Sequence, residues 1–212
     1  MEFSEGLAVD VIYVSWDKAI RMCYELAVKI LNSNEEFDAI VTISRGGLIP
    51  ARIVSDVLGI DEFYTIRSKY WGVYGRVYEE PRVSIHEVID VKDKKVLIID
   101  EVVDTGDTMS KIVDIVYKLG AKEIKVGVLH YKARSKYIPD YYVEKIEKWA
   151  WIFYPWSMSE TLYGLAVKDS HGDVLDRVRR IIEELGVEVD YLGYENLVRS
   201  IEIYRSRYGE PV

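Results

Sequence analysis

The segment VLIIDEVVDTGDT, residues 96–108, constrains the fold more than any other part of the chain. Its first residues form a continuous apolar run that ends at Asp100, a pattern typical of a strand covered on both faces. A glycine turn follows, and then apolar residues recur every three or four positions, which predicts an amphipathic helix ending near Gly120. A strand buried on both faces and followed by a helix predicts an α/β fold with a mostly parallel sheet.

The same alternation of strands and helices runs through the first three quarters of the chain. Ligands of such sheets bind beyond the carboxyl ends of the strands, and Ser44 and Asp100 both lie at predicted strand ends. After Pro155 no further clear strand follows, and three helical stretches predict a small bundle. The predicted strands are 39–44, 63–68, 83–88, 96–100, 124–131 and 141–147, and the predicted helices are 15–31, 48–58, the segment ending at 119, 158–168, 173–185 and 194–208.

Composition excludes several classes of protein. A net charge of -8 leaves no diffuse basic surface for a nucleic acid backbone, so no nucleic acid partner is expected. No apolar run approaches the roughly 18 residues of a membrane span, and the first residues lack a secretory pattern, which predicts a cytoplasmic protein without membrane contact. The lone Cys23 lies on the apolar face of a predicted helix and is interpreted as a structural thiol. Charged residues make up 30% of the chain and glutamine is absent, a pattern typical of proteins from hot environments.

Four carboxylates lie close together around the predicted glycine turn: Asp100, Glu101, Asp104 and Asp107. The main-chain N–H groups of residues 105–108 begin a helix, where free donors and the helix dipole favour an anion such as a phosphate. Asp100 and Glu101 lie a few residues upstream, where they can accept hydrogen bonds from a sugar diol or reach a hydrated Mg²⁺. Asp104 lies between these two zones and is a candidate proton acceptor and donor.

This combination resembles a family signature. A strand, two acidic residues, two apolar residues and D-T-G-x-T, here residues 96–108, resemble the 5-phosphoribosyl 1-pyrophosphate (PRPP) signature of the type I phosphoribosyltransferases. The resemblance implies a twisted, mostly parallel sheet flanked by helices, and an enzyme that joins a base to the ribose of PRPP and releases pyrophosphate with Mg²⁺ bound to the diphosphate. It also implies a homodimer with only small-molecule substrates. The predicted domains are 1–156, the phosphoribosyltransferase domain, and 157–212, the helical bundle.

The resemblance assigns roles to the residues of the signature. Asp100 and Glu101 would contact the ribose hydroxyls, and either could reach the Mg²⁺ that is held mainly by PRPP. Asp104 would lie near N7 of a purine. The 5′-phosphate would bind to Thr105, Gly106, Asp107 and Thr108. Asp107 departs from the glycine or small residue that is commoner there, and its side chain is predicted to cap the helix.

Two further segments resemble the same family. ISRGG, residues 43–47, resembles the pyrophosphate loop of the 6-oxopurine enzymes, with Ser44, Arg45 and Gly46 binding pyrophosphate across a peptide that is often cis. The long loop at about 69–83 is rich in glycine, tyrosine and charge, and with Ser68, Lys69 and Tyr70 it resembles the flexible hood that closes over PRPP.

The segments HYKARS, residues 130–135, and KWAWIFYPWSM, residues 148–158, resemble the base-binding elements of the 6-oxopurine branch. The resemblance implies that Trp151 stacks on the purine, that the backbone near Ile152 reads its edge, and that Lys132 donates to O6. An ammonium group cannot usefully donate to the exocyclic amine of adenine, so Lys132 favours hypoxanthine, guanine or xanthine. Trp156 is interpreted as core packing.

The C-terminal helices favour a different base. The compared 6-oxopurine enzymes end soon after the P-W element, whereas a helical extension is similar to the crenarchaeal adenine phosphoribosyltransferases, and Lys132 has other possible partners in Asp104 or a phosphate. The leading prediction is therefore an adenine phosphoribosyltransferase that makes AMP and pyrophosphate. The alternative is a 6-oxopurine phosphoribosyltransferase. A non-catalytic regulator that senses PRPP or purines is disfavoured because the chain is acidic throughout and retains Asp104.

Overall fold

The computed structural model describes residues 9–69, 71–72, 75–76, 78–168 and 172–209. The chain forms two compact units. The sheet unit comprises Ile20–Tyr70 and Tyr78–Trp149, and the helical unit comprises Met1–Ala19, Trp71–Val77 and Ala150–Val212.

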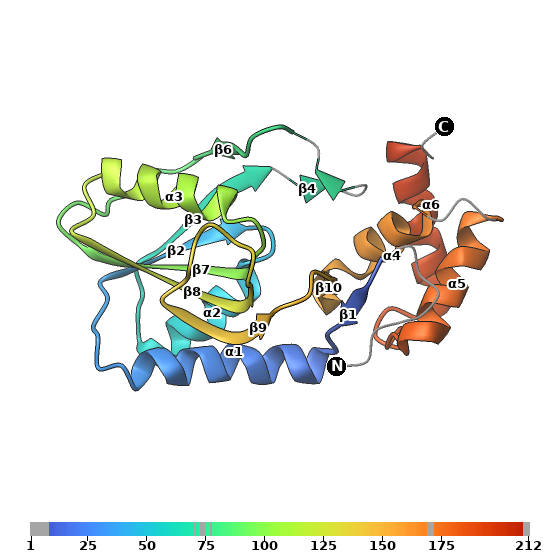
Figure 1. Ribbon diagram of the computed structural model, residues 1–212, viewed down its shortest axis with the longest axis horizontal. Helices are drawn as coiled ribbons and strands as arrows, with labels where there is room; N and C mark the ends of the chain where they lie inside the picture. The colour runs from blue at the N-terminus through green and yellow to red at the C-terminus, as the bar shows by residue number, and fades with distance from the viewer. Residues whose placement is uncertain (1–8, 70, 73–74, 77, 169–171, 210–212) are drawn as a thin grey trace. The chain divides into compact units, whose positions relative to one another are not determined.

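The sheet unit contains a six-stranded sheet with the order β6-β3-β2-β7-β8-β9 (Figure 1). All neighbours in this sheet are parallel except the edge strand β6, which runs antiparallel to β3. The predicted α/β class with a mostly parallel sheet flanked by helices is therefore confirmed. The strands are β2 (Ala39–Ser44), β3 (Phe63–Lys69), β6 (Arg82–Ser84), β7 (Lys95–Val103), β8 (Glu123–Lys132) and β9 (Tyr141–Ile146), and the helices are α1 (Trp16–Leu31), α2 (Leu48–Leu58) and α3 (Asp107–Lys118).

Both faces of β7 are buried, as its continuous apolar run predicted. Val96 and Ile98 share a core with Ile112 and Val116 of α3. Leu97 and Ile99 point to the opposite face and are also fully buried. Figure 1 shows α3 over one face of the sheet, with α1 and α2 over the other. Cys23 is buried in α1, where burial raises the pKa of its thiol to about 12, in keeping with a structural thiol.

Parallel pairing brings the carboxyl ends of β2, β3, β7, β8 and β9 to one edge of the sheet. The strands β2, β3, β7 and β8 end at Ser44, Lys69, Val103 and Lys132. The predicted phosphate and pyrophosphate residues of the sheet unit lie at or next to these ends, and the predicted ribose residues Asp100 and Glu101 lie within the last four residues of β7. The edge is therefore the place where a ligand of a parallel sheet is expected to bind.

The helical unit takes its core from both ends of the chain. Strand β1 (Val11–Tyr13) pairs in parallel with β10 (Trp151–Phe153), and a 3₁₀ turn (Pro155–Ser157) leads into α4 (Met158–Ala166). Helices α5 (Val174–Leu185) and α6 (Tyr194–Tyr208) complete the bundle. β1 and β10 were not predicted, because three residues are too few to show a period.

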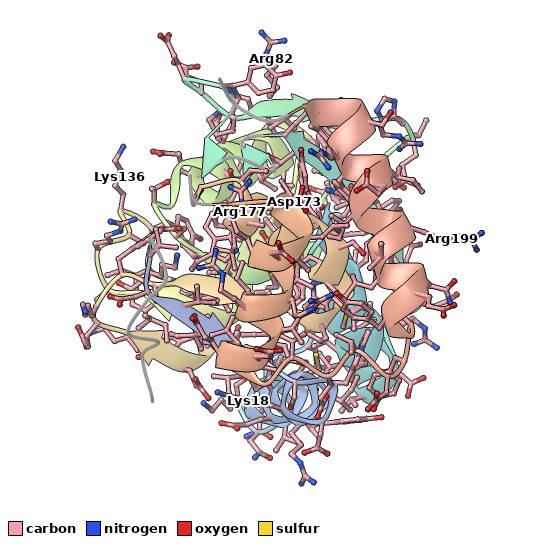
Figure 2. All side chains as sticks on the ribbon, turned by 90° about the vertical axis from the view of Figure 1, so that its right-hand side faces the viewer. Lys18, Arg82, Lys136, Asp173, Arg177 and Arg199 are labelled. Carbon is pink, nitrogen blue, oxygen red and sulfur yellow. The ribbon has the colours of Figure 1, made fainter. Side chains whose placement is uncertain are left out.

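Asp173, the N-cap residue of α5, and Arg177 within α5 make hydrogen bonds at the start of α5 and at the end of α4; Figure 2 labels both side chains. The side chain of Asp173 caps α5 by accepting a hydrogen bond from the N–H of Leu175 (2.8 Å). The buried Arg177 donates to the carbonyl of Ala166 at the end of α4 (2.7 Å). Arg177 thereby satisfies a carbonyl that has no partner within its own helix.

The predicted domain boundary at residue 156 stays a prediction. The compact units divide earlier, at Ala150, and β1 belongs with the helical unit because it pairs with β10. In the predicted hood, β4 (Trp71–Gly72) pairs with β5 (Gly75–Arg76), whereas Tyr70 lies outside the described residues. No helix within the described ranges is both long and apolar enough to cross a membrane.

Candidate active site

The turn between β7 and α3 forms the predicted phosphate cradle. α3 begins at Asp107, directly after Gly106, which has a φ of 85°. A Cβ on Gly106 would lie 2.6 Å from the main-chain nitrogen of Tyr137, so the turn needs glycine for its conformation and for its close neighbour. Lys136, in the segment after β8, stabilises the turn, because its main-chain N–H donates to the carbonyl of Thr105 (3.0 Å). The N-terminus of α3 is thus held in place with donors suited to an anion.

Asp107 does not cap α3, so that sequence-based prediction is wrong. The N-cap position belongs to Gly106, which has no side chain to accept a capping bond. Asp107 instead accepts a hydrogen bond from the hydroxyl of Thr105 (2.8 Å) and pairs with Lys136 Nζ (2.8 Å), whose side chain Figure 2 labels. Asp107 lies one position too late to cap, and Lys136 supplies a cation that offsets its charge beside an anion site.

Asp100 and Glu101 lie together near the end of β7. Asp100 Oδ1 accepts a hydrogen bond from the N–H of Glu101 (2.9 Å). Burial raises the pKa of the Asp100 carboxyl well above its usual range, and the adjacent negative charge of Glu101 raises it further. The Glu101 carboxylate packs against Gly46, where any Cβ would overlap it. The structure thus brings the predicted ribose carboxylates to the predicted pyrophosphate loop.

The predicted pyrophosphate loop joins β2 to α2. The Ser44–Arg45 peptide bond is cis. Ser44 donates weakly to the carbonyl of Ile66 on the adjacent strand (3.5 Å). Ser68 lies near the end of that strand, and its hydroxyl oxygen is buried without a hydrogen-bond partner among the residues that the structure describes. Lys69 is exposed, with its Nζ 6.0 Å from the ring centre of Tyr78.

Three side chains converge on Asp104. Lys132 Nζ donates to Asp104 Oδ2 (2.7 Å), and Arg134 Nη2 donates to Oδ1 (3.3 Å). The indole Nε1 of Trp149 also donates to Oδ2, over a longer distance of 3.4 Å. Burial lowers the pKa of Lys132, whereas the charge and hydrogen bond of Asp104 act in the opposite direction and Arg134 adds to the lowering. Asp104 therefore has donors on both oxygens.

Sequence reasoning missed Arg134 and Trp149. Lys132 Nζ lies 4.8 Å from the ring centre of Trp149, and Arg134 Cζ lies 5.1 Å from it. Arg134 follows Lys132 by two positions, and Trp149 precedes Trp151 by two, so both stood inside segments already singled out. No sequence pattern links Trp149 to Asp104, because 45 positions separate them along the chain and only the fold brings them together.

Trp151 and Ile152 belong to the helical unit. In β10 they pair with Val11 and Ile12, and the indole ring of Trp151 lies 4.7 Å from Lys168 Nζ. Their predicted role at the base stays a prediction. Trp156 stacks on Tyr154 with ring centres 4.9 Å apart, a contact that accords with its interpretation as a packing residue.

The chain is similar to a family model and to several known proteins. Residues 12–161 match the model of the phosphoribosyl transferase domain. A xanthine-guanine phosphoribosyltransferase from Gluconobacter oxydans (strain 621H) is 33% identical over 145 residues, which cover 68% of this chain and 82% of that protein. The matched range of the domain ends within α4, so α5 and α6 lie beyond it.

Two solved structures are also similar to this chain. A purine phosphoribosyltransferase from Pyrococcus horikoshii Ot3 is 38% identical, with a TM-score of 0.60, over 69% of this chain and 93% of that one. A hypothetical protein from Neisseria gonorrhoeae with bound ppGpp is 27% identical, with a TM-score of 0.58, over 86% of this chain and 98% of that one.

Proposed function

The chain belongs to the phosphoribosyl transferase family, and from that membership we propose that it transfers the phosphoribosyl group of PRPP to a 6-oxopurine base. In this reaction a ring nitrogen of the base forms a bond to C1′ of the ribose while the bond from C1′ to the diphosphate oxygen breaks. The ring nitrogen loses its proton and pyrophosphate leaves. The enzyme is a pentosyltransferase whose products are a purine nucleotide and pyrophosphate.

The observation that carries the choice of base is the buried ammonium group of Lys132. Its side chain is only 5% exposed and already donates to Asp104 at the carboxyl end of β8. A buried ammonium needs acceptors, and the O6 carbonyl of hypoxanthine, guanine or xanthine is one, whereas the exocyclic amine of adenine is a donor. Lys132 therefore supports an oxopurine.

The leading sequence-based prediction, adenine, is less well supported than its alternative. It depended on the C-terminal helices, which lie mostly beyond the match to the family model. The Gluconobacter oxydans relative is named for xanthine and guanine, and the Pyrococcus horikoshii structure for purines in general. Together with Lys132, these names favour the 6-oxopurine alternative.

In the proposed complex, the N-terminus of α3 binds the 5′-phosphate through main-chain donors of residues 105–108 and the hydroxyls of Thr105 and Thr108. Asp100 and Glu101 accept hydrogen bonds from the ribose hydroxyls. Bringing a donor or a cation to Asp100 favours its ionised form and relieves its repulsion with Glu101. These two oxygen-rich side chains also fit a hydrated Mg²⁺, which would neutralise charge on the departing diphosphate when bound.

The remaining site residues have proposed roles at the two ends of the reacting bond. Ser44, Arg45 and Gly46 bind the leaving pyrophosphate from one strand end, and Ser68 and Lys69 bind it from the next. Asp104 lies closest to the Lys132 ammonium and accepts or returns the proton of the purine ring. The family resemblance assigns the stacking on the base and the reading of its edge to Trp151 and to the backbone of Ile152, both in the helical unit.

Direct competition among adenine, hypoxanthine, guanine and xanthine for Mg²⁺-PRPP tests the proposal. Pyrophosphate release is measured for each base with the wild-type enzyme and with Lys132→Met, which keeps the length of the side chain and removes its charge. We expect the wild type to prefer an oxo base. The variant should lose about tenfold or more in kcat/KM for that base, because a charge-assisted hydrogen bond is lost. A wild-type preference for adenine would reject the proposal.

A further inference from the structure

Trp149 contacts both cations that donate to Asp104, Lys132 and Arg134, and it lies in the segment between β9 and β10. It follows β9 in the sheet unit and is partly buried. The ammonium of Lys132 and the guanidinium of Arg134 both lie over its ring, at 4.8 Å and 5.1 Å, within the range of a cation–π contact. Its N–H reaches the same oxygen of Asp104 that Lys132 uses.

The ammonium of Lys132 has two competing partners in the proposed reaction. In the structure it donates to Asp104, but an oxopurine requires it at O6. When it turns toward a base, the nearly buried ammonium loses part of its contact with a counter-charge, which is costly in a site of low polarity. An aromatic ring attracts a cation through its face and accepts no conventional hydrogen bond from it. The N–H groups of the ammonium therefore remain available to donate to O6 of the base.

The geometry favours the ring face of Trp149 over its N–H as the active feature. The hydrogen bond from Nε1 to Asp104 Oδ2 is 3.4 Å long, beyond the usual range for N–H donors, and the same oxygen already accepts a much shorter bond of 2.7 Å from Lys132. Arg134 contacts the other oxygen, Oδ1, and so keeps a positive charge beside Asp104 when Lys132 moves.

We propose that Trp149 is a positioning residue that determines base specificity: its ring retains the Lys132 ammonium at the site while that ammonium exchanges Asp104 for the O6 of the base. The inference rests on the proposed function, because it assigns the exchange to an oxopurine. It adds a residue that the family resemblance did not assign and places the purine-reading lysine on an aromatic support in the sheet unit.

A double-mutant cycle tests this coupling. It compares the wild type with Trp149→Leu, Lys132→Met and the double variant, and measures kcat and KM for hypoxanthine and guanine at saturating Mg²⁺-PRPP. Trp149→Leu should lower kcat/KM by about tenfold, the size expected of a desolvated cation–π contact, and should add almost nothing in the Lys132→Met background. Losses that are equal in both backgrounds would overturn the proposal, because a merely structural role of Trp149 does not depend on Lys132.

Trp149→Tyr and Trp149→Phe separate the ring from the N–H, and they keep the test open should Trp149→Leu fail to fold in a thermal melt. Both retain an aromatic face, so their losses should be smaller than that of the leucine variant and should increase from tyrosine to phenylalanine. Losses as large as those from leucine would assign the effect to the N–H and reject the proposal. If the leucine variant does not fold, a Trp149→Phe variant that folds and shows no kinetic coupling to Lys132 would reject it as well.

The matched control is Trp156→Leu, which removes a partly buried tryptophan that stacks on Tyr154 in the helical unit. It should leave the ratio of kcat/KM between hypoxanthine and adenine unchanged. The two proposals fail separately: a wild-type preference for adenine rejects the 6-oxopurine function, whereas an additive cycle on the preferred oxo base rejects only the role of Trp149.

Discussion

At the scale of single residues, the active site holds charge that opposes folding. The pKa of Asp100 is raised because its carboxyl is buried and lies beside Glu101, so ionising it costs free energy in the folded protein. The folded state binds this proton more tightly than the unfolded chain does, where the pKa is about 3.9. The resulting gain in stability is complete below about pH 3.9 and is lost as the pH rises through the higher folded value.

Asp100→Asn should therefore stabilise the protein at pH 8 and leave its stability almost unchanged near pH 4. Asparagine keeps the Oδ1 that accepts from the N–H of Glu101 and removes the charge. Each 1 kcal/mol recovered should raise the Tm by about 2–4 °C in a chain of this size. Calorimetry at both pH values measures the difference, with the exposed Asp61→Asn as control. A lower Tm than wild type at pH 8 would contradict this account of Asp100.

The same substitution should weaken PRPP binding, since the amide loses the charge proposed to accept from the ribose hydroxyls. A residue that destabilises the fold and serves the ligand is common in active sites. Asp104 and Asp107 differ from Asp100, because each has a cation beside it: Lys132 for Asp104 and Lys136 for Asp107. The four neighbouring carboxylates therefore lie in three different environments: Asp100 and Glu101 beside each other, and Asp104 and Asp107 each beside its own lysine.

At the scale of elements, the loop between β2 and α2 contains two glycines that are needed for different reasons. The three atoms nearest to a Cβ on Gly46 would all belong to the carboxylate of Glu101, which is the far end of a flexible side chain. A Cβ on Gly47 would meet the main-chain oxygens of Ile99 (2.8 Å) and Ile43 (2.9 Å), which cannot move without the strands. Gly46 therefore serves the site, and Gly47 serves the packing of α2 on the sheet.

Gly46→Ala and Gly47→Ala form a matched pair of variants. Gly46→Ala should keep the Tm close to that of the wild type and raise the KM for PRPP by about tenfold or more, because it displaces a carboxylate proposed to bind ribose. Gly47→Ala should cost about 1–3 kcal/mol in the free energy of unfolding, as overpacking does. Thermal melts and PRPP titrations on both variants provide the test. Equal effects on stability would show that Glu101 cannot move aside.

The predicted elements of the sheet unit agree closely with the structure where a periodic pattern was long. The bounds of β2 and α2 match residue for residue, and β7 differs by extending to Val103, past the apolar run. β6 is shorter than predicted. The prediction ended this strand at Asp100, whereas the extension of β7 places both Asp100 and Glu101 inside the strand, because pairing with β8 continues to Tyr131.

At the scale of the whole molecule, the two ends of the chain depend on each other. Val11 and Phe153 share their core with Leu162 and Tyr163 of α4 and with Leu197 and Ile201 of α6. All six are almost completely buried. Apolar residues from the predicted phosphoribosyltransferase domain are therefore covered by the predicted bundle.

Removing residues 158–212 should therefore yield a protein that aggregates or melts well below the full-length chain. The deletion exposes Val11 and Phe153, and each buried apolar side chain of this size contributes about 1.5–3 kcal/mol relative to exposure. Soluble yield and Tm measure the effect, with Val88→Ala as a control at a surface position that is 89% exposed. A truncated chain with the Tm and turnover of the full-length protein would instead support an independent domain ending at residue 156.

The sequence by itself determined the α/β class, the order of the main elements and the glycine turn that begins α3, because these depend on local periodicity, on glycine and on the start of a helix. These are properties of neighbouring residues. The proposed phosphate binding of the D-T-G-x-T segment in particular depends on adjacent main-chain donors. A reader of the sequence can find it without knowing what lies across the sheet.

Only the tertiary structure decided what surrounds each charged side chain. It showed that Lys132 and Arg134 converge on Asp104, that Trp149 lies beside both cations, and that Lys136 takes the carboxylate of Asp107. It also paired β1 with β10 across 140 positions of the chain, as between Val11 and Trp151. Electrostatic energies fall with distance in space, and strand pairing needs main-chain partners in register. Neither the distance between two charges nor the register of two strands can be read from the order of residues along the chain.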